Sequence, residues 1–388
     1  LLHSSNMLHK LIMGLMKLSK FLIGGNLDIG AVVPISFLLK KFQFWGKITI
    51  CRVISISEKA NAEEKVVIML KRIGVLTSGG DSPGMNAATR AVVRVAISEG
   101  AEVWGIRNGY KGLLEEDLSK LNFRSVGDII QRGGTFLGTA RCNEFKTPEG
   151  RAKAVEVLNK YKIEGLVVIG GDGSLRGARQ LADLGVAVVG LPGTIDNDIW
   201  GTDYTIGFDT ACNTILDAIN KLKDTASAHS RVIVLEVMGR KSGLLAVMTG
   251  IAGGAEKILI PEVKFDVNEL SNQIKFSHAA GKWYSIIVLA EGAGSAVEIG
   301  KVIGEQTGLD TRVSVLGHIQ RGGSPTAVDR INASLLGKKA ATSILSGITN
   351  VMFGYEKGQI VSVDLIDAVR NKKVIDPVLY KLAEILSR

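Results

Sequence analysis

The feature that most restricts the fold of this chain is an alternation of short apolar segments with helical stretches, which begins at Arg72. The expected strands are 73–77, 103–106, 166–169, 186–189, 231–237, 257–260, 284–290 and 313–316. The helices expected between them include 86–98, 210–227 and 268–280. Strands that alternate with helices predict mainly parallel sheets joined by right-handed crossovers, so we expect an α/β fold.

Two segments rich in glycine and aspartate follow neighbouring strands of this pattern. The first, 170–174 (GGDGS), follows the strand at 166–169, and the second, 192–198 (PGTIDND), follows the strand at 186–189. Open α/β sheets bind ligands at the carboxyl ends of their parallel strands. Glycines there let backbone N–H groups approach phosphate oxygens, and carboxylates supply a metal ligand and a proton acceptor. The pair of segments predicts a phosphoryl-transfer site.

Each of these two segments is weak when taken alone. GGDGS is also a good turn, and Asp-Asn-Asp is typical of Asx-turns. The chain has no Walker P-loop and no GxGxxG after a strand, which argues against a P-loop kinase and a dehydrogenase.

A third segment, 312–330 (RVSVLGHIQRGGSPTAVDR), completes a set of three. In order and spacing the set resembles the signature segments of the bacterial-type 6-phosphofructokinases, and the resemblance runs from about Met69 to the C-terminus. It implies two similar three-layer α/β/α domains with the active site in the cleft between them. The ATP-binding domain would be 69–207 plus 325–374, and the fructose 6-phosphate-binding domain would be 208–324 plus 375–388.

The resemblance also assigns roles at the predicted site. Asp196 would be the general base for the sugar 1-hydroxyl, with a helix cap or an Asx-turn as its structural alternative, and Thr194 would contact the transferring phosphate. Mg²⁺ would be held by Asp172 with help from Asp198, although Asp198 could equally orient its neighbours. The catalytic residues would be Asp196, Thr194, Arg240 and Arg141. The residues that bind ATP would be Gly80, Tyr110, Arg141, Cys142, Gly171, Asp172, Gly173 and Ser174, with Cys142 a bystander beside Arg141.

Several arginines and a histidine would converge on the sugar phosphate, which suits a dianionic group. Together with Thr194 and Asp196, the implied substrate-binding residues are Arg231, Met238, Gly239, Arg240, Glu291, Arg312, His318 and Arg321. In the family, Arg231 and Arg312 reach in from the neighbouring subunit. This implies a homotetramer with shared active sites.

A second anion site is expected for effectors. It corresponds to the family pocket where ADP or GDP activates and phosphoenolpyruvate inhibits. The matching residues are Arg90, Arg94, Lys223, Glu256 and Lys282. Lys223 and Phe123 stand where arginines are familiar, and Arg124 lies next to Phe123, so we expect weaker or altered regulation. The alternative is that these are only exposed helix charges.

The phosphoryl donor is expected to be ATP rather than pyrophosphate. The pyrophosphate-using branch typically has an Asp where this chain has Gly173 and a Lys where it has Gly193. An Asp at 173 would occupy the space of the α-phosphate and repel its charge. The open alternatives are a pyrophosphate-dependent enzyme, a member of the NAD kinase or diacylglycerol kinase group, and a non-catalytic sugar-phosphate sensor on the same fold.

The net charge and the cysteine content limit which kinds of partner and which compartment we expect for this protein. Residues 1–70 hold 9 Lys/Arg and 4 Asp/Glu, a net of +5, and the other 318 residues hold 38 and 34, a net of +4. Without a basic block interleaved with aromatics, we expect no nucleic-acid partner, and a mildly basic body suits phosphate ligands. Cys51, Cys142 and Cys212 have no CxxC spacing and are too few for a disulfide framework, which favours the reducing cytoplasm.

The first 68 residues differ from the rest of the chain. They contain no run of 18 apolar residues, so we expect no membrane span. A targeting peptide is one interpretation of this segment. We favour another, that it is translated upstream sequence and not part of the native fold, because the bacterial proteins it resembles usually begin at the position of Met69.

Overall fold

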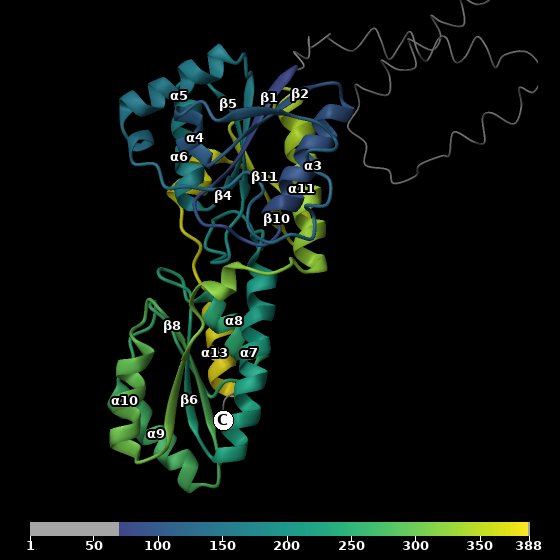
Figure 1. Cartoon of the computed structure of the whole chain (residues 1–388). Coiled ribbons are helices and arrows are strands. Elements are labelled where there is room, and N and C mark those ends of the chain that lie inside the picture. Colours follow the sequence, from purple (N-terminus) through teal and green to yellow (C-terminus); the bar gives the residue numbers. More distant parts are fainter. Residues whose placement is uncertain (1–69, 387–388) are drawn as a thin grey trace, which may run out of the picture. The chain divides into compact units, whose positions relative to one another are not determined.

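The structure is a computed structural model that describes residues 70–386. The described residues form one compact unit (Figure 1). The prediction made for residues 1–68 lies outside the described residues.

The first sheet of the described chain has seven strands in the order β11-β10-β5-β4-β1-β2-β3. The strands β10, β5, β4, β1 and β2 are parallel, while β3 and β11 pair antiparallel at the two edges. Their bounds are β1 (Arg72–Ser78), β2 (Glu102–Ile106), β3 (Leu118–Leu121), β4 (Gly165–Gly170), β5 (Ala187–Pro192), β10 (Val351–Glu356) and β11 (Gln359–Asp364).

Helices cover both faces of this sheet (Figure 1). On one face lie α3 (Met85–Ser98) and α11 (Ala327–Leu345). On the other face lie α4 (Gly109–Leu114), α5 (Pro148–Lys160), α6 (Asp172–Asp183) and α12 (Leu365–Arg370), with the 3₁₀ helix η3 (Glu144–Lys146). In β4, Val167 packs into the core beneath α3 and α11, whereas Leu166 and Val168 pack into the core beneath α6. The strand is apolar throughout because both of its faces are buried.

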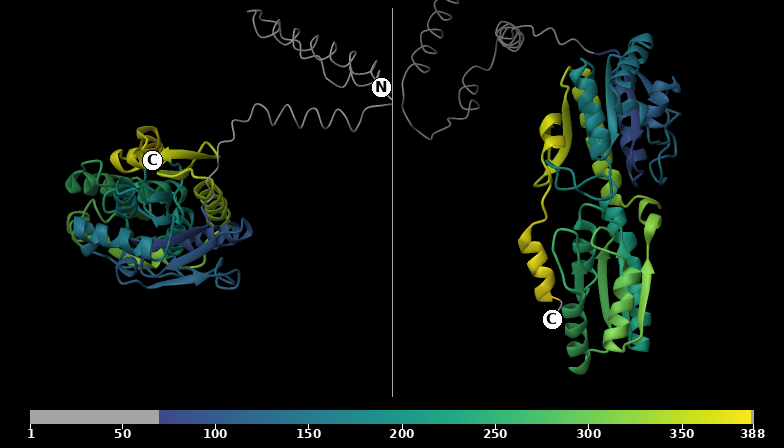
Figure 2. Two further views of the ribbon diagram at one scale, coloured as in Figure 1. Left: turned by 90° about the horizontal axis from the view of Figure 1, so that it is seen from above. Right: turned by 90° about the vertical axis from the view of Figure 1, so that its left-hand side faces the viewer.

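The second sheet has four parallel strands in the order β7-β8-β6-β9. Their bounds are β6 (Val232–Val237), β7 (Lys257–Leu259), β8 (Ser285–Ala290) and β9 (Thr311–Val315), and η4 (Gly317–Arg321) follows β9. One face is covered by α7 (Phe208–His229), α8 (Leu244–Ala252) and α13 (Pro377–Leu386), and the other by α9 (Val267–Ala279) and α10 (Ala296–Thr307). Figure 2 shows α13, in yellow, running alongside this sheet, and its Ala383 is buried in the core formed with α7 and α8.

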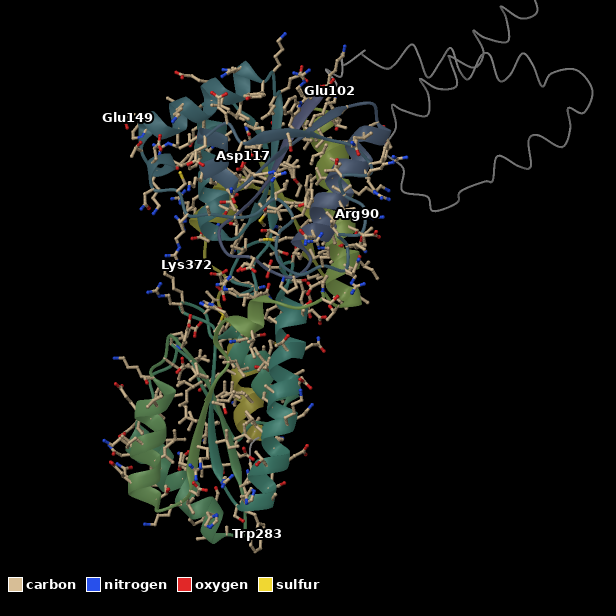
Figure 3. All side chains as sticks on the ribbon, viewed as in Figure 1. Arg90, Glu102, Asp117, Glu149, Trp283 and Lys372 are labelled. Carbon is tan, nitrogen blue, oxygen red and sulfur yellow. The ribbon has the colours of Figure 1, made fainter. Side chains whose placement is uncertain are left out.

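The architecture confirms the predicted fold class. Each of the two mainly parallel sheets has helices on both faces and so forms a three-layer α/β/α arrangement. Some strand ends differ from the sequence expectation. β9 starts at Thr311 and stops at Val315, because Leu316 takes a right-handed helical conformation (φ −74°) and begins the turn into η4. The chain returns from the first sheet to the second through the segment between α12 and α13, where Lys372 lies (Figure 3). The exact domain boundaries remain a prediction.

Candidate functional site

A cavity of about 600 Å³ lies at the carboxyl ends of β1, β4 and β5. Since these strands are parallel neighbours, the loops that follow them meet at one edge of the sheet. Many residues predicted from the sequence line it: Gly80, Tyr110, Arg141, Cys142, Gly171, Asp172, Gly173, Ser174, Thr194, Asp196, Asp198 and Arg321. The nucleotide, metal and base residues predicted from the sequence therefore share one cavity.

Close backbone packing explains the glycines at this edge. A Cβ atom on Gly170 would lie 2.4 Å from the carbonyl oxygen of Ser78, and the Gly193 N–H donates to the Gly170 carbonyl at 3.0 Å. The helix α6 begins at Asp172, and its N-cap, Gly171, has no side chain to accept from the first-turn N–H groups. Unpaired N–H groups at a helix N-terminus favour an anion, so this end of α6 is suited to a phosphate.

Asp172 and Arg176 form an ion pair on the first turn of α6. The Arg176 Nε donates to both carboxylate oxygens of Asp172 at 3.0 Å, and both side chains are about half exposed. Hydrogen bonding to Asp172 raises the pKa of the Arg176 guanidinium. Both residues line the cavity.

The loop that carries Asp196 is held by its own side chains. Asn197 has a positive φ of 50°, and its buried amide donates to the Asp203 carbonyl and accepts from the Thr205 N–H at 2.9 and 3.0 Å. The Thr205 hydroxyl donates to the Thr194 carbonyl at 2.6 Å, and the Thr194 Oγ1 accepts from the Asp196 N–H at 3.3 Å. These contacts fix the direction in which Asp196 enters the cavity.

Burial raises the pKa of Asp196 to about 6, and the nearby Asp198 carboxylate adds to the rise while Arg321 opposes it. The pKa of Asp198 is also raised, mainly by burial, with a further contribution from Asp172. Three carboxylates therefore share one electrostatic environment, which is how sites that take up a proton or a cation are built. Within residues 70–386 no three His, Cys, Asp or Glu side chains form a metal cage. Mg²⁺ does not need such a cage, because one or two carboxylates commonly hold it together with phosphate oxygens and water.

A lysine that the sequence analysis missed lies behind the loop that carries Asp196. Lys373 donates to the carbonyls of Thr202 and Asp203, both at 2.8 Å. Burial lowers its pKa to about 8, against the opposing effect of Asp203 and Asp198. No pattern in the sequence pointed to it, since Lys373 is some 170 residues from the loop it contacts.

The aromatic wall of the cavity is formed by Tyr110 and Phe145. Their rings stack with centroids 3.9 Å apart and an interplanar angle of 9°, and the Tyr110 hydroxyl donates to the Ser174 carbonyl at 2.6 Å. Burial raises the pKa of Tyr110 far above its usual value. Tyr110 is among the residues predicted from the sequence, whereas Phe145 and the cavity-lining residues Lys146, Arg176 and Gln180 are not. Arg176 and Gln180 were detectable, because they lie four and eight residues after Asp172 on the same helix.

The carboxyl ends of the second sheet gather most of the predicted sugar-phosphate residues. Met238 follows β6 and donates its N–H to the buried Gln320 of η4 at 3.1 Å, and Glu291 follows β8 and donates its N–H to the Val237 carbonyl. Gly239 has a φ of 135°, which favours glycine, and a Cβ there would lie 2.5 Å from the Ser242 carbonyl. The exposed Arg240 comes next, and His318 lies in η4 beside Gln320.

Arg321, also in η4, connects these residues with the cavity. Its guanidinium lies against Gly80, where an added Cβ would approach Nη1 to 2.2 Å, and Nη1 donates to the Asp81 carbonyl at 3.3 Å. Arg321 also lowers the pKa of Asp196, whereas Glu291 raises it, so both residues lie within electrostatic reach of that carboxylate.

Arg231 and Arg312 lie apart from the other predicted sugar-phosphate residues. Both pair with Asp310 through Nε, at 2.6 and 2.9 Å. Arg231 directly precedes β6 and Arg312 is the second residue of β9, so they lie at the amino ends of strands whose carboxyl ends lead to Met238 and to η4. Within one chain the structure does not bring the two groups together.

The five candidate effector residues fall into two groups. Arg90 and Arg94 lie on α3, where burial and the neighbouring Arg94 lower the pKa of Arg90 (Figure 3). Glu256 and Lys282 form an ion pair at 3.7 Å next to the second sheet, and the Lys223 Nζ lies beside Gly254. Phe123 is 46% exposed. The two groups belong to elements of different sheets.

These features define an α/β protein whose glycine-rich loops and carboxylates share one cavity. A family model described as phosphofructokinase matches residues 72–344. An ATP-dependent 6-phosphofructokinase of Clostridioides difficile is 58% identical over 318 residues, which are 82% of this chain and 100% of that protein. Those of Bacillus licheniformis and Bacillus subtilis are 59% and 58% identical with the same coverage. The chain belongs to the phosphofructokinase family, in its bacterial type, as the sequence predicted.

Solved structures give the same assignment. Phosphofructokinase from Saccharomyces cerevisiae matches with a TM-score of 0.72 and 39% identity over 77% of this chain and 45% of the yeast chain. Pichia pastoris phosphofructokinase in the T-state matches with a TM-score of 0.74 and 37% identity over 78% and 35% of the two chains. A pyrophosphate-dependent phosphofructokinase from Marinobacter aquaeolei has a TM-score of 0.73 over 79% of this chain and 86% of its own, but at 23% identity it shares the fold alone. No helix within residues 70–386 is long and apolar enough to cross a membrane.

Proposed function

We propose that the protein transfers the γ-phosphoryl group of ATP to the 1-hydroxyl of fructose 6-phosphate and so forms fructose 1,6-bisphosphate. The observation that carries this proposal is the position of Asp196. Its carboxylate, with a pKa raised to about 6, lines the cavity of the glycine loops and interacts with Glu291 and Arg321 from the second sheet. A base at this junction is placed to accept the proton of a sugar hydroxyl as the new P–O bond forms.

The residues around Asp196 would bind the nucleotide and stabilise the phosphoryl group during transfer. Thr194 would contact the transferring phosphoryl group, while Arg141 and Arg240 would spread its developing negative charge over fixed donors. The N–H groups at the start of α6, with Gly80, Gly171, Gly173 and Ser174, would hold the nucleotide phosphates. Tyr110 would shape the nucleotide pocket beside Cys142.

Asp172 and Asp198 would hold Mg²⁺, which supplies charge neutralisation for the donor phosphates when it is bound. The fit is supported by the position of both carboxylates on the cavity and by the contribution of Asp172 to the raised pKa of Asp198. Loss of one carboxylate should therefore weaken Mg²⁺ binding more than fructose 6-phosphate binding.

On the sugar side, Glu291 would accept hydrogen bonds from sugar hydroxyls near Met238 and Gly239. His318, Arg240 and Arg321 would bind the 6-phosphate from the same chain. Arg231 and Arg312 lie too far along their strands to join them, which supports the proposal that a neighbouring subunit supplies them. A homotetramer with shared active sites would then be the working enzyme.

Regulation and location complete the proposal. ADP or GDP as activator and phosphoenolpyruvate as inhibitor would bind Arg90, Arg94, Lys223, Glu256 and Lys282, with two subunits contributing to one pocket. The enzyme would work in the cytoplasm, where its substrates occur. The predicted domain division, 69–207 plus 325–374 and 208–324 plus 375–388, would put each sheet in one of two domains.

A coupled assay with fructose 6-phosphate and MgATP tests the activity, with magnesium pyrophosphate as the second donor. Turnover with MgATP is expected, at a rate well above that with pyrophosphate. A protein that binds fructose 6-phosphate without turnover would be a sensor. NAD or diacylglycerol as the preferred acceptor would place it in the runner-up kinase group.

A further inference from the structure

Arg176 is a cation of the cavity to which the sequence pattern assigned no role. It lies one turn after Asp172 on α6, and both of its hydrogen bonds to that carboxylate come from Nε. Within residues 70–386, neither Nη1 nor Nη2 has a hydrogen-bond partner, so further N–H donors remain for another acceptor. These donors belong to a side chain that lines the cavity of about 600 Å³.

The ion pair between Arg176 and Asp172 can be broken at a small cost. Arg176 and Asp172 have side-chain exposures of 53% and 46%. A solvent-exposed pair at i and i+4 contributes little to stability, so breaking it has a small cost. A nucleotide phosphate offers the guanidinium the same kind of charge-assisted hydrogen bond, from an acceptor group that carries more negative charge than one carboxylate.

We propose that Arg176 exchanges partners during nucleotide binding, leaving Asp172 and donating to a phosphate of the nucleotide. Arg176 donates to both carboxylate oxygens of Asp172, so it competes there with Mg²⁺, a second cation that would use the same oxygens. The same exchange therefore frees the metal carboxylate and adds a phosphate ligand. This inference rests on the proposed binding of ATP in the cavity.

Isothermal titration calorimetry with the non-hydrolysable triphosphate AMP-PNP and Mg²⁺ tests the exchange directly. The variant R176Q is expected to bind about tenfold more weakly than the wild type, the loss expected for one charge-assisted contact. R176K keeps the charge but lacks the planar donor set, so it should fall in between. The matched control is R179Q on the same helix, because Arg179 forms its own i, i+4 pair with Asp183 at 2.6 Å but does not line the cavity.

A double-mutant cycle in EDTA separates the exchange from simple charge effects. Without Mg²⁺, D172N should tighten AMP-PNP binding by about tenfold when Arg176 is present, since the guanidinium is then released toward the phosphates. In the R176Q background the same change should have an effect below about threefold. Equal effects in both backgrounds would overturn the proposal, as would R176Q binding MgAMP-PNP as tightly as the wild type.

The wild type distinguishes failure of this inference from failure of the proposed function. If wild-type protein binds MgAMP-PNP and turns over MgATP with fructose 6-phosphate while R176Q binds normally, only the partner exchange is wrong. If wild-type protein does neither, the proposed function is wrong.

Discussion

Asp329 caps the start of a helix in another part of the chain by accepting two hydrogen bonds from Thr210, one from its backbone N–H at 2.8 Å and one from its hydroxyl at 2.5 Å. The Gly207 N–H donates to the same carboxylate at 2.8 Å. Asp329 lies at the start of α11, in the third signature segment, and Thr210 lies in the first turn of α7, directly after the loop that carries Asp196. The third segment therefore has a structural task as well as the ligand-binding one the resemblance implies.

Replacing Asp329 with Ala should lower the free energy of unfolding by about 3 kcal/mol or more, because three buried donors lose their acceptor. Urea unfolding measures this change. The matched control is D364A, since the Asp364 carboxylate caps α12 by accepting one exposed hydrogen bond from the Ile366 N–H at 2.9 Å. That variant should lose only about 1 kcal/mol. If D329A were no less stable than D364A, the buried cap would not hold the two helices together.

Much of this arrangement could be predicted from the sequence. Apolar runs in the sequence predict the buried strands β1, β4 and β8, and the glycine loops after β4 and β5 predict the position of the cavity. The antiparallel edge strands β3 and β11 were missed, because LSKL and QIVSVD are short, partly exposed and partly polar.

The site residues that were missed depend on distant or helical contacts. Lys373 acts through two backbone carbonyls of a remote loop, and Phe145 through its ring stacking on Tyr110. Arg176 and Gln180 left a local signal, their spacing of four and eight residues from Asp172 on α6.

Changing Asp196 to Ser should lower kcat by about 10²-fold or more and leave fructose 6-phosphate binding near normal, since a general base contributes to the chemical step. Steady-state kinetics together with equilibrium binding of the sugar phosphate separate the two effects. The comparison variant is D203S, because Asp203 lies in the same loop but does not line the cavity. A D196S enzyme with near wild-type kcat would remove Asp196 from the role of base.

The pH dependence of kcat/KM should have an acidic limb near pH 6. The pKa of Asp196 is raised from its usual value to about 6, so the ionised form that accepts a proton dominates above that pH. Activity should therefore be present at pH 7 to 8 and fall as the pH decreases through about 6. The substrate phosphates titrate in the same range, so the variant E291Q serves as the check. Loss of the Glu291 charge should move the limb to lower pH, and a limb that stays in place would belong to the substrate.

Arg312 should affect the affinity for fructose 6-phosphate. It should do so at the active site of a neighbouring subunit. R312S is expected to raise KM for fructose 6-phosphate with little change in kcat, because in the proposed site the residue would bind a non-reacting group. Mixing R312S with D196S subunits tests the shared site. Some hybrid sites then combine Asp196 from one subunit with Arg312 from the other, so activity at low fructose 6-phosphate should exceed that of either parent. Hybrids no more active than the parents would place each site within a single chain.

The choice of phosphoryl donor can be tested at Gly173 without a steric side effect. A Cβ atom there meets no other atom within 4 Å, so an Asp fits the backbone, and its effect should come from charge next to the nucleotide phosphates. G173D should raise KM for MgATP by about tenfold or more and leave fructose 6-phosphate binding nearly unchanged. G173N has a similar size without the charge and is the matched control.

Gly193 is less suitable, because a Cβ there would lie 2.8 Å from the Met85 Cε and a Lys would also disturb the core. The donors are compared by measuring turnover of the wild type and G173D with MgATP and with magnesium pyrophosphate. Wild-type turnover with pyrophosphate equal to that with ATP would show that Gly173 and Gly193 do not select the donor.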